Sequence, residues 1–191
     1  MRVLAAGLLL AACSGQPSED LATYVGHGFA FQHPRALAVV ELPSSGVAPS
    51  GDSGQLRAGE DTNDPRERFE AIGIAWVRLA LDQGDIPAAL ERGIAGALDG
   101  AQERGDFGIT HRGQLRSLER GDGRLVYQSF SGRPDQGRRV YGTAGSLYCP
   151  DDGRVFVLGG RLFVMVVASN EWGSESRAAQ AFERYFAALR C

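Results

Sequence analysis

The sequence has no lysine, and all 20 of its basic residues are arginine. Without lysine there is no Ser-x-x-Lys site for acyl transfer, and no Gly-x-Ser-x-Gly motif occurs either. Neither Gly26-His27-Gly28 nor Gly159-Gly160 forms a phosphate-binding loop, since the first lacks a third glycine and the second is expected in a hairpin turn. Exclusive use of arginine is interpreted as genome composition; recognition of phosphate or carboxylate groups is the alternative.

Positive charge and long apolar runs are also scarce. The formal net charge at pH 7 is -3 and the isoelectric point is about 5.6, which argues against a nucleic-acid partner. The apolar run at residues 3–10 is too short to cross a bilayer, since a spanning helix needs about 20 residues. This run is therefore expected to be a signal sequence and not an anchor helix.

Residues 1–13 carry the most specific motif of the chain. Arg2 supplies a positive start, an apolar run follows, and Leu10-Ala11-Ala12-Cys13 forms a small-residue cleavage site that ends in cysteine. This ending resembles the lipobox of bacterial lipoproteins. The resemblance implies cleavage before Cys13, a diacylglycerol on its sulfur and acylation of the new amino group. A buried helix that ends in an ordinary cysteine is the alternative.

The lipobox resemblance also predicts a location. Several acyl chains, at about 0.8 kcal/mol for each buried methylene, would hold the protein on a membrane. Ser14 follows the cysteine, where an inner-membrane lipoprotein of the enterobacterial type more often carries aspartate. We therefore expect a signal peptide at residues 1–12 and a lipidated cysteine and tether at residues 13–23. The expected location is the outer membrane, facing the periplasm or the cell surface.

The chain has three cysteines, and with Cys13 lipidated Cys149 and Cys191 remain as a pair. An extracytoplasmic compartment is oxidising, so the pair is expected to form a disulfide. Closing a loop of this length would contribute about 4 kcal/mol in the ideal case. Two free thiols are the alternative, and a catalytic cysteine would lack an identifiable base.

The strongest fold signal lies near the C-terminus. Two apolar runs, 155–158 and 162–167, flank Gly159-Gly160 and predict a hairpin with a two-residue turn. Both faces of the second run are apolar, so it is expected to be a central strand covered on both sides. Apolar residues then recur at helical spacing after Ser174 or Ser176, which predicts an amphipathic helix that lies on the sheet.

The rest of the chain predicts strands, one further helix and one long loop. Strands are expected at residues 24–34, 37–42, 71–79, 107–118, 125–130 and 138–149. A helix is expected after an N-cap at Asp85, with Leu90, Ile94 and Leu98 on one stripe. Residues 43–68 are rich in Gly, Ser, Pro and acids and predict a long exposed loop. This order predicts an α+β fold, a mainly antiparallel sheet with one or two helices, in a single domain at residues 24–191.

Two stretches and the final helix also resemble a known fold. Residues 28–34 read Gly-Phe-Ala-Phe-Gln-His-Pro, and residues 155–167 precede a helix that carries Phe182 and Phe186. These features resemble the opening strand, late hairpin and terminal helix of the PsbP-like fold. Its members are mostly photosynthetic subunits, small lipoproteins, and assembly or binding factors. The resemblance implies an accessory role and supplies no catalytic residue; the long loop and the paired cysteines depart from its pattern.

Metal ligands are present but poorly arranged. His27 and His33 would lie about 20 Å apart at the two ends of one straight strand, and His111 is distant in sequence. We therefore expect no metal at the histidines. The predicted loop also contains acidic residues without the ordered spacing of a calcium loop: Asp52, Glu60, Asp61 and Asp64.

Two surface features have open interpretations. Arg133, Arg138 and Arg139 form a small basic cluster, which is either a solvated hairpin end or a contact for lipid headgroups or an acidic partner. Trp172 precedes the last helix and is expected to be a lid on the core, with an exposed contact as the alternative.

These patterns predict a lipid-anchored extracytoplasmic protein with a non-enzymatic binding or accessory role. We expect a membrane contact through the lipid anchor, an envelope protein as partner, no cofactor and no nucleic acid. One alternative is an envelope hydrolase whose acidic and histidine residues converge only in three dimensions, for which His111 beside a carboxylate in a deep pocket would be the sign. Another is a purely structural lipoprotein.

Overall fold

The structure, a computed structural model, describes residues 20–43, 48–59, 68–103, 108–120, 123–133, 137–151, 159–187 and 189. These residues form two helices, α1 (Ile86–Glu103) and α2 (Glu175–Phe186). They also form nine strands: β1 (Leu21–Gly26), β2 (Phe29–Pro34), β3 (Ala38–Leu42), β4 (Ser53–Gly59), β5 (Glu70–Ala80), β6 (Ile109–Arg120), β7 (Gly123–Gly132), β8 (Val140–Pro150) and β9 (Gly159–Ser169).

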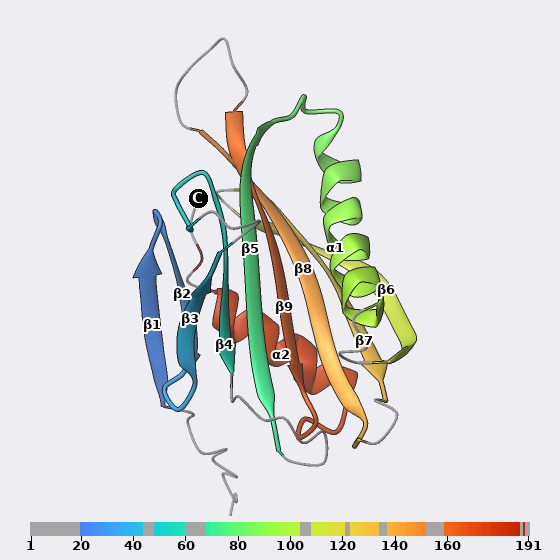
Figure 1. Ribbon diagram of the computed structural model, residues 1–191. Helices are drawn as coiled ribbons and strands as arrows, with labels where there is room; N and C mark the ends of the chain where they lie inside the picture. The colour runs from blue at the N-terminus through green and yellow to red at the C-terminus, as the bar shows by residue number, and fades with distance from the viewer. Residues whose placement is uncertain are drawn as a thin grey trace, which may run out of the picture.

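Seven strands make one antiparallel sheet in the order β3-β4-β5-β9-β8-β7-β6, and β1 and β2 make a separate hairpin. The two helices lie on opposite faces of the large sheet (Figure 1). The predicted α+β class with a mainly antiparallel sheet is therefore confirmed. Within the described residues, no helix combines the length and apolar character needed to cross a membrane.

β9 lies at the centre of the sheet because both of its faces are apolar. Phe163, Met165 and Val167 belong to the core on the α2 side, whereas Leu162 and Val166 pack against the core on the α1 side. Alternate residues of a strand point to opposite faces, so such a strand has to be covered twice. The prediction of a central, doubly covered strand is confirmed.

α2 begins where its sequence predicts. Ser174 is the N-cap, and its hydroxyl oxygen accepts a hydrogen bond from the backbone N–H of Arg177. Gly145 of β8 lies under the Phe182 ring, which would overlap a side chain at that position. The helix therefore packs close to the sheet. Its buried face consists of residues at helical spacing: Ala178, Ala179, Ala181, Phe182, Tyr185 and Phe186.

α1 carries the predicted apolar stripe, with Leu90, Ile94 and Leu98 buried against the other face of the sheet. Gly93 weakens an isolated helix by about 1 kcal/mol relative to alanine. In the folded protein a β-carbon at this position would lie 3.0 Å from Ser146 Oγ. Gly93 therefore allows the close approach of α1 to β8.

The stretch predicted as one strand at residues 24–34 is a hairpin, so that prediction is wrong. The chain reverses at His27 and Gly28, whose φ angles of 50° and 75° are both left-handed, as a two-residue hairpin turn requires. Asn-Gly is the usual signal for this turn, and His-Gly does not provide it. The hairpin packs on the α2 side of the sheet through Phe29 and Phe31.

Part of the predicted 43–68 loop is also a strand. β4 pairs with β3 and β5 and buries Leu56 and Ala58, so the loop prediction is wrong for residues 53–59. The sequence of β4 has only these two apolar residues and therefore a low local preference for a strand. Hydrogen bonding to β3 on one side and β5 on the other outweighs this low preference. Residues 44–47 and 60–67 of the predicted loop lie outside the described residues.

The predicted turn at Gly159-Gly160 is wrong as well. Both residues lie in β9, where Gly160 pairs with Pro150 of β8 and Leu79 of β5. A β-carbon on Gly160 would lie 2.5 Å from the carbonyl oxygen of Cys149, so this glycine serves close strand packing and not chain reversal. The predicted partner strand at residues 155–158 lies outside the described residues.

Candidate functional site

We call the end of the molecule at which β1 starts the tether end, because the predicted tether leads into it. β1 starts at Leu21, so residues 21–23, predicted as tether, belong to the first strand. The opposite end, with the His27-Gly28 turn and Gly159, is the far end. The strand registers place other strand termini at the tether end (Figure 1): Pro34, Glu70, Ile109, Gly132, Val140 and Ser169.

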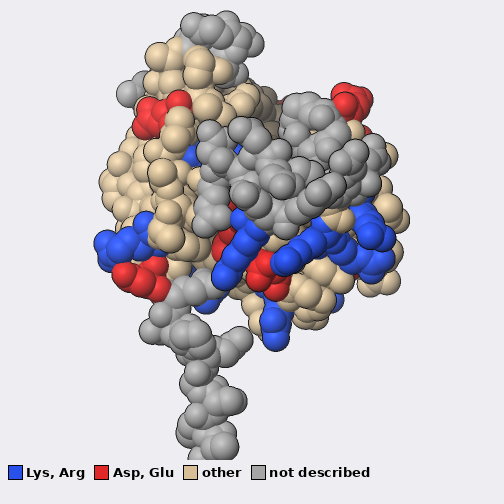
Figure 2. Space-filling model, turned by 60° about the horizontal axis from the view of Figure 1, so that its bottom comes forward, with Lys and Arg blue, Asp and Glu red and all other residues tan. Residues whose placement is uncertain are grey.

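Arginine side chains gather on the tether end (Figure 2). Arg35 pairs with Asp20 at 2.8 Å, and Glu171 pairs with Arg138 at 3.1 Å and with Arg68 at 3.8 Å. Three further exposed arginines at this end form no ion pair within the described residues: Arg133, Arg139 and Arg177. The predicted basic cluster is thus part of a larger charged surface.

The loop between β9 and α2 is fixed to the start of β5. Ser169 Oγ donates to the carbonyl oxygen of Phe69 at 2.8 Å and accepts from the backbone N–H of Glu171 at 3.0 Å. Asn170 Oδ1 accepts from the backbone N–H of Phe69 at 3.1 Å. Trp172 is 9% exposed and belongs to the core on the α2 side, so it is the predicted lid. The charged surface therefore rests on a well-connected backbone.

His111 lies beside a carboxylate at this end. Its Nδ1 is 2.7 Å from Glu175 Oε1, and Ser131 Oγ donates to the same oxygen at 3.1 Å. The pairing of β6 with β7 is irregular on both sides of His111 and Arg112, and such bulges re-aim side chains at a sheet edge. Glu175 lies in the first turn of α2, where the helix dipole favours a negative charge.

This arrangement does not suit nucleophilic catalysis. A serine nucleophile needs a base in contact with its hydroxyl, and the orienting carboxylate lies behind that base. Here Glu175 lies between Ser131 and His111, so the carboxylate occupies the place of the base. The His111 side chain is 61% exposed and no deep pocket encloses it. The expected sign of a hydrolase was a carboxylate beside His111 in a deep pocket. The carboxylate is present, but the exposed His111 does not lie in a deep pocket.

A second histidine and carboxylate meet near the far end. His27 Nε2 is 3.1 Å from Glu41 Oε1, and the Tyr24 hydroxyl donates to the same oxygen at 2.7 Å. Burial and, next, the Glu41 carboxylate raise the pKa of Tyr24 to about 12. The hydrogen bonds from Tyr24 and His27 lower the pKa of Glu41. These contacts join the β1–β2 hairpin to β3.

The remaining candidate ligands do not converge. His33 Nδ1 lies 2.9 Å from the carbonyl oxygen of Pro34, and Asp52 pairs with Arg78 at 2.6 Å. No cluster of three or more His, Cys, Asp or Glu side chains that could hold a metal ion occurs in the part of the chain that the structure describes. The other acids of the predicted loop lie outside that part: Glu60, Asp61 and Asp64.

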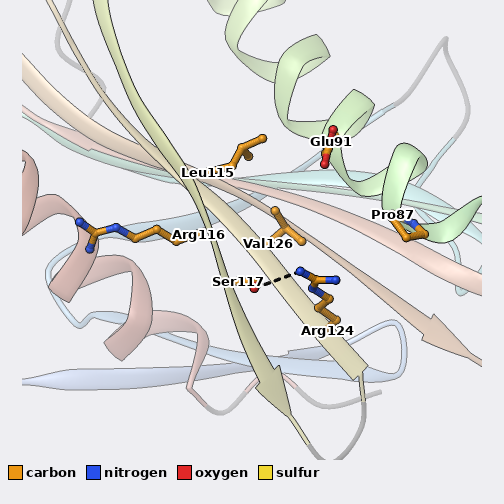
Figure 3. Close-up of a pocket in the computed structure, with 7 residues that line it drawn as sticks. All are labelled: Pro87, Glu91, Leu115, Arg116, Ser117, Arg124 and Val126. Carbon is orange, nitrogen blue, oxygen red and sulfur yellow. Dashed lines mark hydrogen bonds between the residues drawn. The ribbon is translucent and has the colours of Figure 1, made fainter.

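A small pocket lies between α1 and the β6–β7 pair (Figure 3). Within it, Arg124 donates to Ser117 Oγ at 3.2 Å. Its volume is about 110 Å³, whereas pockets for small molecules measure about 300–1,000 Å³. It is therefore smaller than a typical small-molecule site. The lining residues come from three elements: Pro87, Glu91, Leu115, Arg116, Ser117, Arg124 and Val126.

The cysteines are described only in part. Cys149 of β8 is 3% exposed and is disulfide-bonded. Its predicted partner Cys191 and the predicted lipidation site Cys13 both lie outside the described residues. The pairing of Cys149 with Cys191 and the lipidation of Cys13 therefore stay predictions.

Exposed apolar side chains lie away from the tether end. Val25, which is 78% exposed, comes just before the hairpin turn, and Val77 and Leu118 lie in the far halves of β5 and β6. The large apolar side chains that are exposed within the described residues are Val25, Val40, Leu42, Val77, Leu115 and Leu118. The exposed apolar side chains thus lie toward the far end, which also carries ion pairs such as that of Arg78 with Asp52.

Glu171 and Glu175 are members of the charged surface that the sequence did not reveal. His111 and Glu175 are 64 positions apart, and no periodic pattern connects them. The only local signal for Glu175 is its place directly after the predicted cap Ser174. The arginine and histidine partners of these two acids follow from the register of the sheet and not from residue spacing.

Comparison with known proteins adds no relative. No protein-family model matches the chain, and no curated protein matches it. The resemblances to bacterial lipoproteins and to the PsbP-like fold therefore stay predictions.

Proposed function

We propose that the protein is a lipoprotein of the bacterial cell envelope, anchored through acyl chains on Cys13, whose domain binds a protein or another envelope component without catalysis. The observation that carries the proposal is Leu10-Ala11-Ala12-Cys13, followed by a short polar segment and then β1. Fully extended, the chain from Cys13 to Leu21 spans at most about 25 to 30 Å. The tether end would therefore stay close to the membrane surface.

The character of the far end supports binding. With the tether end held toward the membrane, Val25 and Val77 would be presented to the periplasm or the medium. Exposed apolar side chains mark contact surfaces where they gather. A hydrolase is less well supported, because Glu175 separates Ser131 from His111 and the pocket between α1 and β6 is small.

The anchor is tested by labelling the protein with a fatty acid in a bacterial host and separating the membranes by density. We expect the wild-type protein to carry the label and to collect with the outer membrane, and Cys13→Ser to lose the label. Cys149→Ser is the matched control and should keep it. A wild-type protein without label in the soluble fraction contradicts the proposal.

The binding role is tested by a photo-crosslinking residue at position 25 or 77, with the exposed position 102 in the last turn of α1 as control. We expect a discrete adduct from the two far-end positions in living cells and none from position 102. Absence of adducts at both far-end positions would instead favour a purely structural lipoprotein.

A further inference from the structure

Two unpaired arginines lie side by side at the tether end. Arg133 follows Gly132 and Arg139 precedes Val140, and Gly132 and Val140 are partners in the β7–β8 ladder. Directly paired residues of neighbouring strands lie about 5 Å apart, so the two arginines leave the sheet next to each other. Both are exposed, and neither forms an ion pair within the described residues.

A third unpaired arginine comes from α2. The backbone N–H of Arg177 donates to Ser174 Oγ at 3.3 Å, which fixes this residue in the first turn of the helix at the tether end. The nearby carboxylates already have partners: Asp20 pairs with Arg35, and Glu175 accepts from Ser131 and contacts His111. Within the described residues, the guanidinium groups of these three arginines therefore have no carboxylate partner.

We propose that Arg133, Arg139 and Arg177 dock the tether end onto anionic phospholipid headgroups. A guanidinium group binds phosphate oxygens through two parallel hydrogen bonds, and basic clusters are attracted to anionic leaflets. This inference rests on the proposed anchor, which would bring the surface to the membrane. It goes further by naming the face that meets the lipid and the chemistry of the contact.

The distribution of charge and apolar surface favours docking over insertion. None of the exposed large apolar side chains among the described residues lies at the tether end, so the contact would be with headgroups and not with acyl chains. The whole chain has a net charge of -3, so an anionic surface repels the rest of the molecule while it attracts this end. The result is an orientation with the far end away from the membrane.

The two tryptophans make the docking measurable. Trp172 lies at the tether end beside Glu171, and Trp76 lies toward the far end, where its indole N–H donates to the carbonyl oxygen of Ser50 at 2.9 Å. Two variants of the lipidated protein keep one tryptophan each: Trp76→Phe keeps Trp172, and Trp172→Phe keeps Trp76. Each variant is reconstituted into vesicles that contain a lipid with a spin-labelled headgroup, which quenches nearby tryptophan fluorescence. One set of vesicles is phosphatidylcholine alone, and the other also contains phosphatidylglycerol.

We expect phosphatidylglycerol to increase the quenching of Trp172 and to leave that of Trp76 unchanged. Raising the salt concentration to 1 M shortens the screening length from about 10 Å to about 3 Å and should remove the increase. Arg133→Gln with Arg139→Gln should weaken docking roughly tenfold to thirtyfold. The control, Arg57→Gln with Arg92→Gln, changes the net charge by the same amount at exposed positions on β4 and α1. This control should keep the increase in Trp172 quenching that phosphatidylglycerol causes.

Equal quenching of Trp172 in the two kinds of vesicle would overturn the docking proposal. Docking by these arginines would also be overturned if the Arg57 and Arg92 control lost the increase in Trp172 quenching as fully as the Arg133 and Arg139 variant. Net charge alone would then explain the increase. A crosslink from position 139 to an acidic protein, without any lipid dependence, would replace the membrane by that protein. Failure of the lipidated protein to float with either vesicle would overturn the anchor itself, which separates the two proposals.

Discussion

Single side chains hold the β1–β2 hairpin on the domain, because this hairpin shares no ladder with the seven-stranded sheet. The guanidinium of Arg161 donates to the carbonyl oxygens of His27 and Gly28 at 2.7 and 3.1 Å. Tyr24 donates to Glu41 from the other side of the hairpin. The segment that would join the lipid anchor to the domain thus depends on a few polar contacts and an aromatic cluster.

Substitution of Tyr24 by phenylalanine is expected to change the alkaline stability of the protein. The pKa of Tyr24 is about 12 in the folded protein against an ordinary 10.0, so the folded state keeps the phenol proton longer than the unfolded chain does. The free energy of unfolding therefore falls as the pH rises from 10 to 12. In Tyr24→Phe this fall should be shallower, as measured by urea unfolding across that interval. An unchanged slope would contradict the proposed environment, and Tyr141→Phe controls for the loss of a hydroxyl.

Removal of the Arg161 guanidinium is expected to loosen the hairpin selectively. Arg161→Met keeps an apolar stem beside Phe163 but leaves the turn carbonyls without charged donors, which is worth about 1.5 to 3 kcal/mol. Hydrogen exchange should accelerate in β1 and β2 and stay near the wild-type rate in β9. Arg78→Met removes two exposed ion pairs, with Asp52 and Asp151, as a control and should change the free energy of opening by less than about 1 kcal/mol. Uniform acceleration in all strands would argue against a selective role.

Helices and strands with a strong apolar periodicity were predicted correctly from the sequence. Segments whose structure depends on their neighbours in the fold were not. The apolar runs of β5 and β9 and the stripes of α1 and α2 each determine their own structure, because burial of those residues leaves one arrangement. β4 has two buried apolar residues, and its strand state comes from its neighbours β3 and β5. The His27-Gly28 turn lacks its usual residue type. Contacts such as that of His111 with Glu175 depend on register, which single-sequence patterns do not contain.

Gly160 provides a direct test of the corrected strand assignment. In β9 a methyl group on Gly160 would meet the Cys149 carbonyl oxygen and the Tyr148 ring, so Gly160→Ala should lower the free energy of unfolding by about 1 to 3 kcal/mol. Gly73→Ala on β5 has open space around its β-carbon and should be close to neutral. Equal effects in chemical denaturation would mean that Gly160 is not packed between strands.

In the whole molecule, the arginines without an ion pair among the described residues lie at the tether end, and the most exposed apolar side chains lie toward the far end. The lipobox-like motif and the unpaired arginines would belong to the membrane side, and the exposed valines near the far end to the partner side. The fold class was predictable from the sequence. The presence of Arg133 and Arg177 at the same end was not, because it depends on the β7–β8 ladder and on where α2 starts.

Reduction is expected to weaken the whole fold, because Cys149 is buried in the core and disulfide-bonded. Loss of a native disulfide typically lowers the free energy of unfolding by about 2 to 5 kcal/mol. Urea unfolding with and without reductant measures the difference. If Cys191 is the partner as predicted, the double variant Cys149→Ser with Cys191→Ser should match the reduced protein and should no longer respond to reductant. A response that survives in the double variant would exclude this pairing.

The most direct test of the account is the intact mass of the protein purified from bacterial membranes, with and without reduction. We predict a chain that starts at Cys13 and carries the added mass of acyl groups, and that gains two hydrogens when the disulfide is reduced. A mass equal to the unmodified chain, or a chain that retains residues 1–12, would contradict the lipid anchor. It would also remove the basis for orienting the tether end toward the membrane.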